Sequence, residues 1–395
     1  MKETLVPSQL LKNIDDSIKS LSGYNKYSIK QINRLKKSLI SLWMYIYERQ
    51  KASNVISYDM YVNIGWKELK PFKLIIKGRI IQYSELISLL KEAEVIKINK
   101  RYRVDSFTMS YKIDLSFLNT THFTEVEIDF KKIYRNLKSK EYWLAKYPRH
   151  CNIIESSYNV SVDLDSYIYW LRSNIGMALK PKCINGVVQK RKLTPEIAYS
   201  SVQKCLKVNF KNLWFKVSDT GRFYSNVVNL PSTAIPFISL FDRQGLTSID
   251  ITNCQPLLLA TRVNSEEYKK DVCVGTFYDN LSTLTKRDRN WVKLQSFKYI
   301  FFNDNLLKSG ELYNAMESIY PGVMDQINEL KQKEKLWKVL QKLESKIIVE
   351  RVGISAGLNV ITRHDEILCY SENKIEIENL IKDEFAKMNL KVRLK

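Results

Sequence analysis

Apolar residues recur at every third or fourth position from Ser28 to Lys51, and lysines and arginines occupy the opposite face. This spacing predicts one long amphipathic helix. A second helix is predicted over about 83–93. Alternating apolar and polar residues after it predict short strands at 95–98, 102–104 and 110–113, with a hairpin turn at Asn99-Lys100.

Helices followed by a hairpin are typical of a winged helix, in which the hairpin is the wing. A small α+β packing module fits the same pattern, because basic residues on the presumed wing can simply face solvent. These basic residues are Lys97, Lys100, Arg101 and Arg103. Both interpretations stay open for this N-terminal module, which we expect to bind nucleic acid.

The rest of the chain divides by pattern into two parts. The stretch from about 124 to 145 has the composition of a helix, a break follows at 146–150, and 160–215 is predicted to be mostly helical. From 217 to 225 no helical period remains. The run 246–252 alternates like a strand before an apolar stretch that can begin a helix. We therefore expect an α+β protein with an N-terminal helical/winged-helix-like module over 1–125, a helical region over 126–215 and a mixed region over 216–395.

Charge narrows the class of partner. The chain has 395 residues with 63 Lys and Arg against 42 Asp and Glu, a formal net charge of +21. Such a positive field favours a polyanion, and nucleic acid is the leading class. The six cysteines form no C-x-x-C pair, so neither a zinc cluster nor a disulfide framework is indicated. No run approaches about 18 apolar residues and acids occur near the start, which predicts a cytoplasmic protein that binds no membrane.

Two acidic positions far apart in the sequence are candidates for one site. Asp250 ends a predicted buried strand, where an unpaired carboxylate is costly without a cation, a hydrogen-bond network or a metal. Later, two strand-like runs flank His364-Asp365-Glu366, which predicts a β-hairpin with acids at its turn. If this hairpin pairs with the earlier strand, Asp250 and Asp365 can hold two divalent ions about 3.5–4 Å apart. The alternative is that each acid caps a turn or pairs with a lysine.

Between these acids, four residues follow one another at intervals of four. They are Arg289, Lys293, Phe297 and Phe301. On a helix, this spacing forms one stripe with cations first and aromatic rings afterwards. The cations can bind a triphosphate, and an aromatic ring one turn later can stack on a base or sugar. The alternative is an ordinary surface helix with a buried aromatic edge.

The order and spacing of these residues resemble the polymerase domain of family A DNA polymerases, over about 215–395. That family's T-G-R-x-x-S-x-x-x-N-L segment matches Thr220-Gly-Arg-Phe-Tyr-Ser-Asn-Val-Val-Asn-Leu230 without a gap. Its motif A, a strand ending in D-Y-S-Q-x-E, resembles Asp250-Ile-Thr-Asn-Cys-Gln255, and its motif C is His364-Asp365-Glu366. Its motif B, R-x-x-x-K-x-x-x-F-x-x-x-Y, resembles the stripe from Arg289 to Phe301.

The resemblance implies a right-hand polymerase with a palm, fingers and a small thumb, the thumb coming from the helical region over 126–215. The metal ligands would be Asp250, Asp365 and Glu366, holding two Mg²⁺ or, in their place, Mn²⁺. Arg289 and Lys293 would bind the incoming phosphates, and Lys293 could also supply a proton on the leaving side.

The same resemblance implies further contacts. Phe297 would stack near the nucleotide, and Gln255 and Phe301 would lie beside its sugar. The residues placed against the primer-template DNA are Arg222, Asn229, Gln341 and His364, with Gln341 on a helix just before motif C.

Two positions depart from the family pattern. Gln255 replaces the glutamate that blocks a ribose 2′-hydroxyl, and Phe301 replaces the tyrosine that pairs with that glutamate. Because phenylalanine has no hydroxyl, the same hydrogen-bonded pair cannot form. Sugar preference therefore stays open. The N-terminal 215 or so residues also lack the acidic set of a proofreading exonuclease.

The leading hypothesis is a DNA-directed DNA polymerase without proofreading, with dNTPs as substrates and primer-template DNA as its partner. A second hypothesis is an enzyme that makes RNA or adds nucleotides without a template. A third is a non-catalytic DNA-binding protein of replication initiation.

Overall fold

The structure, a computed structural model, is an α+β protein built from helices and small sheets. Two compact units divide the chain: unit 1 comprises 1–137, 168–178 and 192–206, and unit 2 comprises 138–167, 179–191 and 207–395. The three-part division into 1–125, 126–215 and 216–395 stays a prediction. The residues that the structure describes are 2–21, 23–52, 61–99, 109–114, 122–134, 138–184, 187–355, 357 and 359–395.

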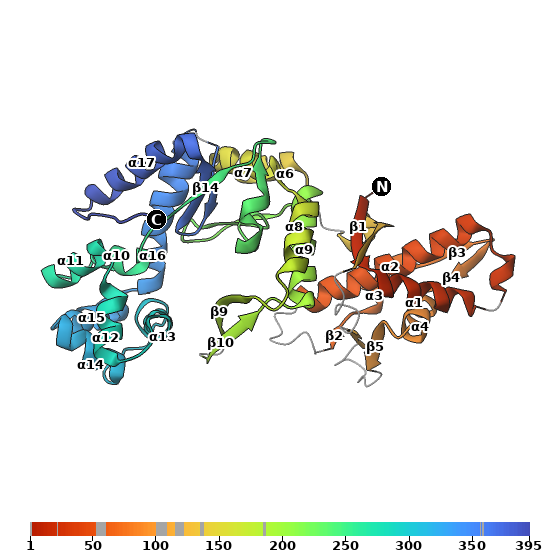
Figure 1. Ribbon diagram of the computed structural model, residues 1–395, viewed down its shortest axis with the longest axis horizontal. Helices are drawn as coiled ribbons and strands as arrows, with labels where there is room; N and C mark the ends of the chain where they lie inside the picture. Colours follow the sequence, from red (N-terminus) through yellow and green to blue (C-terminus); the bar gives the residue numbers. More distant parts are fainter. Residues whose placement is uncertain are drawn as a thin grey trace. The chain divides into compact units, whose positions relative to one another are not determined.

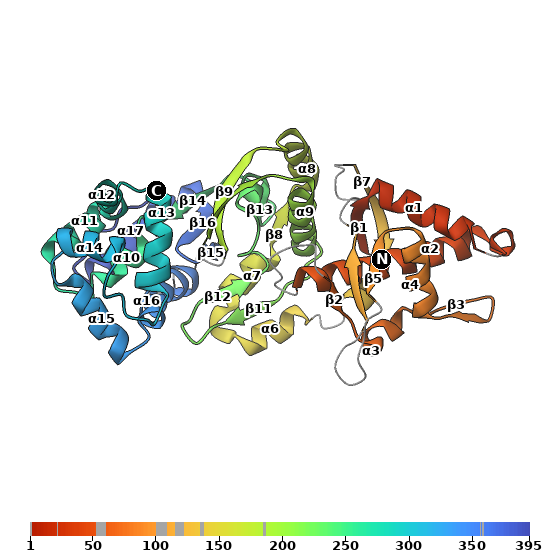
Figure 2. The ribbon, with the colours of Figure 1, turned by 90° about the horizontal axis from the view of Figure 1, so that it is seen from below.

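Three helices form the centre of unit 1 (Figure 2): α1 (Ser8–Lys19), α2 (Ile29–Ala52) and α4 (Tyr83–Glu92). Each buries one apolar face against the others, which is why amphipathic spacing predicted α2 and α4. Helix α1 was not predicted. The predictions of helices over 28–51 and 83–93 are confirmed. Within this core, the Trp43 ring stacks on Tyr47 one turn later, with centroids 5.7 Å apart.

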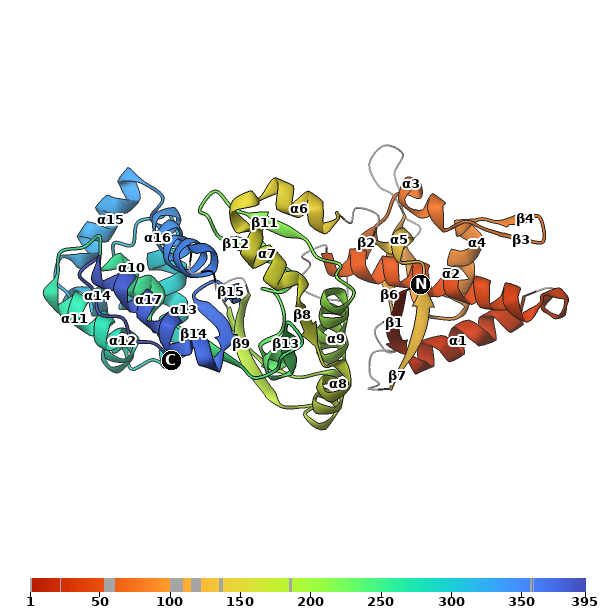
Figure 3. The same ribbon diagram turned by 90° about the horizontal axis from the view of Figure 1, so that it is seen from above.

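Short strands and turns surround these helices, and Figure 3 shows the β3–β4 hairpin as a narrow projection. The strands are β1 (Lys2–Pro7) paired with β7 (Phe123–Ile128), β2 (Val62–Asn63) and β5 (Ile96–Asn99) on either side of β6 (Ser110–Ile113), and β3 (Leu74–Ile76) paired with β4 (Arg79–Ile81). The short helices are η1 (Tyr24–Lys26), α3 (Trp66–Leu69), η2 (Lys70–Phe72) and α5 (Phe130–Ile133).

Strand β5 includes Asn99, which was predicted to lie in a turn, and it pairs with β6, where Asn99 lies opposite Ser110. The predicted strand at 102–104 lies outside the described residues. Lys97 on this strand forms an ion pair with Asp114 at 3.2 Å. The predicted wing residues Lys100, Arg101 and Arg103 lie outside the described residues.

The helix predicted over 124–145 is also wrong in its first part. Residues 123–128 form β7, in which Thr124, Val126 and Ile128 are β-branched and favour an extended backbone. Pairing with β1 over six positions, from Lys2 opposite Ile128 to Pro7 opposite Phe123, satisfies the backbone. Helical structure begins only with α5 and continues in α6 (Lys140–Lys146).

The chain from 148 to 240 contains both helices and strands. The prediction that 160–215 is mostly helical is therefore only partly correct. The runs 178–184 and 187–192 form two strands that pair with each other. The elements are η4 (Pro148–His150), α7 (Cys151–Tyr158), β8 (Val160–Val162), α8 (Leu164–Ser173), β9 (Ala178–Ile184), β10 (Val187–Lys192), α9 (Pro195–Asn209), β11 (Phe215–Val217), β12 (Phe223–Ser225), η5 (Ser232–Phe237) and β13 (Ile238–Leu240).

The sheet that positions the candidate site has three antiparallel strands in the order β14-β16-β15. They are β14 (Leu246–Asp250), β15 (Ile361–Arg363) and β16 (Glu366–Tyr370), so the strand ending at Asp250 and the hairpin around Asp365 are confirmed. Ile249 and Ile367 lie opposite each other and are fully buried. Figure 1 shows α17 (Lys374–Ala386) lying along this sheet.

The remaining helices of unit 2 share one apolar core with that sheet. Two segments are π-helices that directly follow an α-helix: η6 after α13, and η7 after α16. The elements are α10 (Cys254–Leu259), α11 (Glu266–Val274), α12 (Phe277–Thr285), α13 (Arg289–Gln295), η6 (Ser296–Phe301), α14 (Glu311–Ile319), α15 (Val323–Lys333), α16 (Leu336–Ser345), η7 (Lys346–Ser355) and η8 (Ser371–Asn373). Within the described ranges, no helix is both long and apolar enough to cross a membrane.

Candidate active site

The two aspartates that the sequence singled out meet at one end of the β14-β16-β15 sheet. Asp250 is the last residue of β14 and lies opposite Glu366, the first residue of β16. Asp365 occupies the tight turn before β16, and the backbone N–H of Ile251 donates to its carbonyl oxygen at 3.2 Å. The turn requires His364 to adopt φ of 58°, a left-handed conformation. Strand register therefore brings residues 115 positions apart in the sequence (365 − 250) to one edge.

The other edge of β14 is covered by the segment 393–395. Asp250 N–H donates to the Lys395 carbonyl at 3.2 Å, and Lys395 N–H donates to the Asp250 carbonyl at 3.0 Å. Thr252 N–H donates to the Arg393 carbonyl at 3.0 Å. The backbone around Asp250 is thus held from both sides, which fixes the origin of its side chain.

A cavity of about 470 Å³ opens at this end of the sheet. Its walls come from all three predicted motifs, because β14 and α10, α13, and the β15–β16 turn converge on it. The predicted site residues that line it are Asp250, Gln255, Arg289, Lys293, Phe297, His364, Asp365 and Glu366. Residues lining it that the sequence did not single out include Tyr278, Arg363 and Lys395.

The surroundings of Asp250 disfavour its negative charge. Loss of hydration raises the pKa of the Asp250 carboxyl, and the negative charge of Asp365 raises it further. The cations of Lys395 and Lys293 act in the opposite direction. A divalent cation between the two carboxylates would relieve their repulsion, so the donor set fits Mg²⁺ or Mn²⁺, which prefer carboxylate oxygens.

Glu366 is engaged by neighbouring side chains. The Ser248 hydroxyl donates to its Oε1 at 2.6 Å, and Arg363 Nη1 donates to its Oε2 at 2.9 Å. Arg363 also donates to the carbonyl oxygens of Val228 and Leu230. Glu366 thus holds Arg363, which in turn binds the 228–230 segment. Of the three carboxylates that line the cavity, only Asp250 and Asp365 have no side-chain hydrogen bond among the described residues.

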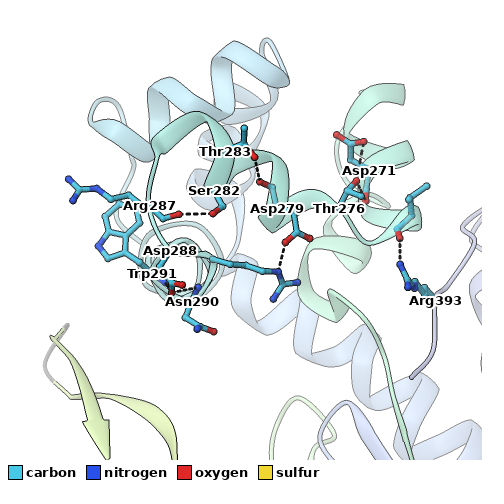
Figure 4. A network of polar contacts seen from close by, with 12 residues as sticks. Asp271, Thr276, Asp279, Ser282, Thr283, Arg287, Asp288, Asn290, Trp291 and Arg393 are labelled. Carbon is cyan, nitrogen blue, oxygen red and sulfur yellow. Dashed lines mark hydrogen bonds and ion pairs between the residues drawn. The ribbon is translucent and has the colours of Figure 1, made fainter.

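The cationic wall is built by the start of α13. Asp288 caps the helix, since its carboxylate accepts from the backbone N–H groups of Asn290 and Trp291, as Figure 4 shows. Arg289 Nε donates to Asp279 on α12 at 2.7 Å, and its guanidinium lies 5.5 Å from the centre of the Tyr278 ring. These contacts hold the arginine at the rim of the cavity while leaving its terminal nitrogens available to an anion.

The aromatic part of the stripe divides between the cavity and the core. Lys293 Nζ lies 5.8 Å from the centre of the Phe297 ring, and both residues line the cavity. Phe301 is 1% exposed and belongs to the apolar core, outside the cavity lining. The change from α-helix to π-helix at Ser296 accounts for this, because a wider turn shifts the side chains that follow it.

Arg222 lies in a buried cluster rather than on the wall of the cavity. Its Nε and Nη2 donate to the two carboxylate oxygens of Glu344 at 2.9 and 2.7 Å. The Gln255 side-chain amide donates to the same carboxylate. With Arg222 14% and Glu344 2% exposed, the predicted contact between Arg222 and DNA would require this pair to open.

The other predicted DNA contacts are dispersed. Asn229 is exposed and lies outside the cavity lining, next to the lining residue Val228. Gln341 on α16 accepts a hydrogen bond from the Thr220 hydroxyl at 3.3 Å and also lies outside the lining. His364 lines the cavity, and its ring lies 5.7 Å from that of Tyr224 in an edge-on arrangement. Loss of hydration lowers the pKa of His364, and Arg222 lowers it further.

Four contributors were missed from the sequence. Glu344 follows Gln341 by three residues, so the two lie on one face of a helix, and this spacing could have identified Glu344 as a neighbour of the site. Arg363 directly precedes the H-D-E tip and was an equally local signal. Tyr278, whose hydroxyl is buried without a hydrogen-bond partner among the described residues, and Lys395 depend on tertiary pairing and gave no signal.

Comparison of the chain with models of known protein families gives no match. Comparison with curated proteins gives no match either.

Proposed function

We propose that this protein is a template-directed nucleotidyltransferase, specifically a DNA polymerase of the family A type without a proofreading exonuclease. One observation carries the proposal: Asp250 and Asp365 converge on a cavity that Arg289 and Lys293 also line. Nucleotidyl transfer needs carboxylates for divalent ions and cations for phosphates within one site. The proposal includes a right-hand arrangement, with the β14-β16-β15 sheet as the palm and α13 in the fingers.

In this mechanism, Asp250 and Asp365 would hold two Mg²⁺ ions, or Mn²⁺. When bound, such ions lower the pKa of a primer 3′-hydroxyl and stabilise the charge of departing pyrophosphate. The two aspartates act as ligands because the sheet register and the 393–395 segment fix their backbones. No covalent residue is required, since positioning and charge neutralisation supply most of the acceleration.

The α13 helix supplies the groups that bind the nucleotide. Arg289 donates from Nε to Asp279, and its terminal nitrogens can donate to a phosphate. Lys293, one turn later, adds a second cation and can protonate the leaving group. Phe297 presents an apolar ring beside Lys293, where a base or sugar can stack.

Primer extension by the purified full-length chain tests the proposal. We expect Mg²⁺- or Mn²⁺-dependent, template-dictated addition of nucleotides to a labelled primer, and loss of at least three orders of magnitude in Asp250→Asn and Asp365→Asn. Asp383→Asn is the matched control, because Asp383 is exposed on α17 and its side chain makes no hydrogen bond or ion pair within the described residues. Equal extension by wild type and Asp250→Asn would contradict the assigned site.

RNA synthesis is the second candidate. Gln255 donates to Glu344, and Phe301 is buried in the core, so no carboxylate–tyrosine pair guards the sugar position. Parallel extension with dNTPs and NTPs distinguishes the two: preferential NTP incorporation on the same template would replace DNA synthesis as the conclusion. Addition of either class to a blunt duplex without template direction would indicate a tailing enzyme.

A further inference from the structure

Unit 1 carries a second hollow, remote in sequence from the acidic site and different in charge. Its volume is about 360 Å³, and it lies where α2, β3 and α5 meet. Its only described carboxylate is Asp129. The lining residues are Arg34, Lys37, Ser38, Lys73, Leu74, Ile75, Asp129 and Lys132.

Two of the four cations are already compensated. Lys37 forms an ion pair with Glu127 at 3.0 Å, and Lys132 forms one with Asp129 at 3.2 Å. Asp129 Oδ1 also accepts from the backbone N–H of Lys132 at 3.3 Å, so both of its oxygens are used at the start of α5. Asp129, which lines the hollow, and Glu127, which does not, therefore neutralise Lys132 and Lys37.

The other two cations have no carboxylate partner among the described residues. Arg34 Nη1 donates to the backbone carbonyl of Ile75 at 3.2 Å, a neutral acceptor that fixes the guanidinium and leaves its charge uncompensated. The Lys73 ammonium makes no described hydrogen bond or ion pair. An arginine held by one nitrogen, with its remaining donors free beside a lysine, matches the geometry by which proteins bind phosphate.

The cations continue along α2 beyond the hollow. Lys30, Arg34 and Lys37 are spaced by four and three residues, so they lie on one face of the helix, and Lys30 is exposed. This row of three cations extends beyond the reach of one phosphate, so it suits a chain of phosphates better than a single ion. A net charge of +21 adds a long-range attraction for such a chain.

We propose that this hollow binds a backbone phosphate of a nucleic acid, with Arg34 and Lys73 as its ligands and Lys30 contacting a neighbouring phosphate. The site shares no lining residue with the acidic cavity, and it needs no divalent ion. Nucleic-acid binding at this hollow would hold whether or not the chain polymerises nucleotides.

Fluorescence anisotropy of a labelled DNA duplex with the full-length chain, in EDTA and over a range of KCl concentrations, tests the site. The test variant is Arg34→Gln/Lys73→Gln. The matched control is Lys12→Gln/Lys91→Gln, which removes the same charge from exposed positions on α1 and α4. Circular dichroism and thermal melting of both variants establish that they fold.

We expect the test variant to lose about tenfold or more in affinity and its slope of log K against log salt to fall by about one to two, as for lost phosphate contacts. The control should change by less than about threefold. Equal losses in both variants, or an unchanged slope in the test variant, would overturn the proposal. If inorganic phosphate binds wild type but not the test variant while DNA affinity is unchanged, the hollow takes a free anion and the nucleic-acid assignment is wrong.

Discussion

Arg222 and Glu344 form a buried, two-fold hydrogen-bonded ion pair that joins the β11–β12 hairpin to α16. Gln255 on α10 donates to the same carboxylate, so three separate segments meet there. Burial raises the pKa of Glu344, and Arg222 lowers it in compensation. The pair lies close enough to the acidic site that Asp365 also affects the pKa of Glu344.

Breaking this pair on one side should be strongly destabilising. Glu344→Gln leaves Arg222 buried without a counter-charge, and we expect a loss of about 3–5 kcal/mol in the free energy of unfolding. The double variant Arg222→Met/Glu344→Leu should lose less stability than Glu344→Gln, because no charge stays buried. Urea unfolding of these two variants and of wild type measures this. Arg243→Met, at an exposed ion pair with Glu372, is the control and should have a much smaller effect.

Divalent ions should stabilise the wild-type protein but not its acid-site variants. A ligand at about one hundred times its Kd adds about 2.7 kcal/mol to the free energy of unfolding. Melting curves with and without Mg²⁺ should therefore shift for wild type and for Asp383→Asn, and stay in place for Asp250→Asn. Without metal, Asp250→Asn should melt no lower than wild type, since it removes repulsion from Asp365. An equal metal-induced shift in Asp250→Asn would place the ion elsewhere.

Lys331 should give the stability a distinctive pH dependence. Lys331 is 8% exposed, and its ammonium donates to the carbonyls of Tyr299 and Asn305 at 2.6 and 3.0 Å. Loss of hydration lowers the pKa of Lys331 from 10.5 to about 8. Between these two values the unfolded chain binds more protons than the folded one, so the free energy of unfolding rises with pH over this window.

The measurement is denaturant unfolding of wild type against Lys331→Met at a series of pH values. The difference between the two should grow in favour of wild type from about pH 8 to 10.5 and stay constant below pH 8. Lys333→Met, at an exposed position on the same helix, should show no such trend. A flat difference for Lys331→Met would mean that its pKa is ordinary.

Gly353 should tolerate no side chain without loss of stability. A Cβ there would lie 2.7 Å from Ile153 Cδ1 and 3.0 Å from Thr362 Cγ2, between η7, α7 and β15. We expect Gly353→Ala to cost about 1–3 kcal/mol in unfolding free energy. Adding Ile153→Val, which removes Cδ1, should recover part of that loss. Additive losses in the double variant would show that the contact with Ile153 is not the cause.

The spacing of apolar residues predicted the helices and strands that bury only one face. The amphipathic helix at 29–52 and the strand ending at Asp250 follow from spacing alone, because each presents one face to a core. The strand β7 was misjudged because its identity depends on pairing with β1, more than a hundred residues earlier. Asn99 was misjudged for a related reason: the turn signal at Asn99-Lys100 does not reveal that Asn99 belongs to β5 and lies opposite Ser110.

The charged residues of the acidic site were predictable from the sequence, but the tertiary contacts that hold them in place were not. The sequence identified Asp250, Asp365, Arg289 and Lys293, which line one cavity. It assigned Arg222 to DNA, whereas the fold pairs Arg222, in the turn between β11 and β12, with Glu344 on α16, a pairing that depends on tertiary structure. The contribution of Lys395 depends on a backbone bridge beside β14, for which no local signal exists.

The π-helix at 296–301 sets the angular position of the cationic wall relative to the core. Each of its turns holds about one residue more than an α-helical turn. Winding the same residues as a regular α-helix, with none deleted, would rotate α13 by about 100° relative to the anchored Phe301 ring. Arg289 and Lys293 would then face away from two aspartates that had not moved, so this short segment sets the angular phase between the two halves of the site.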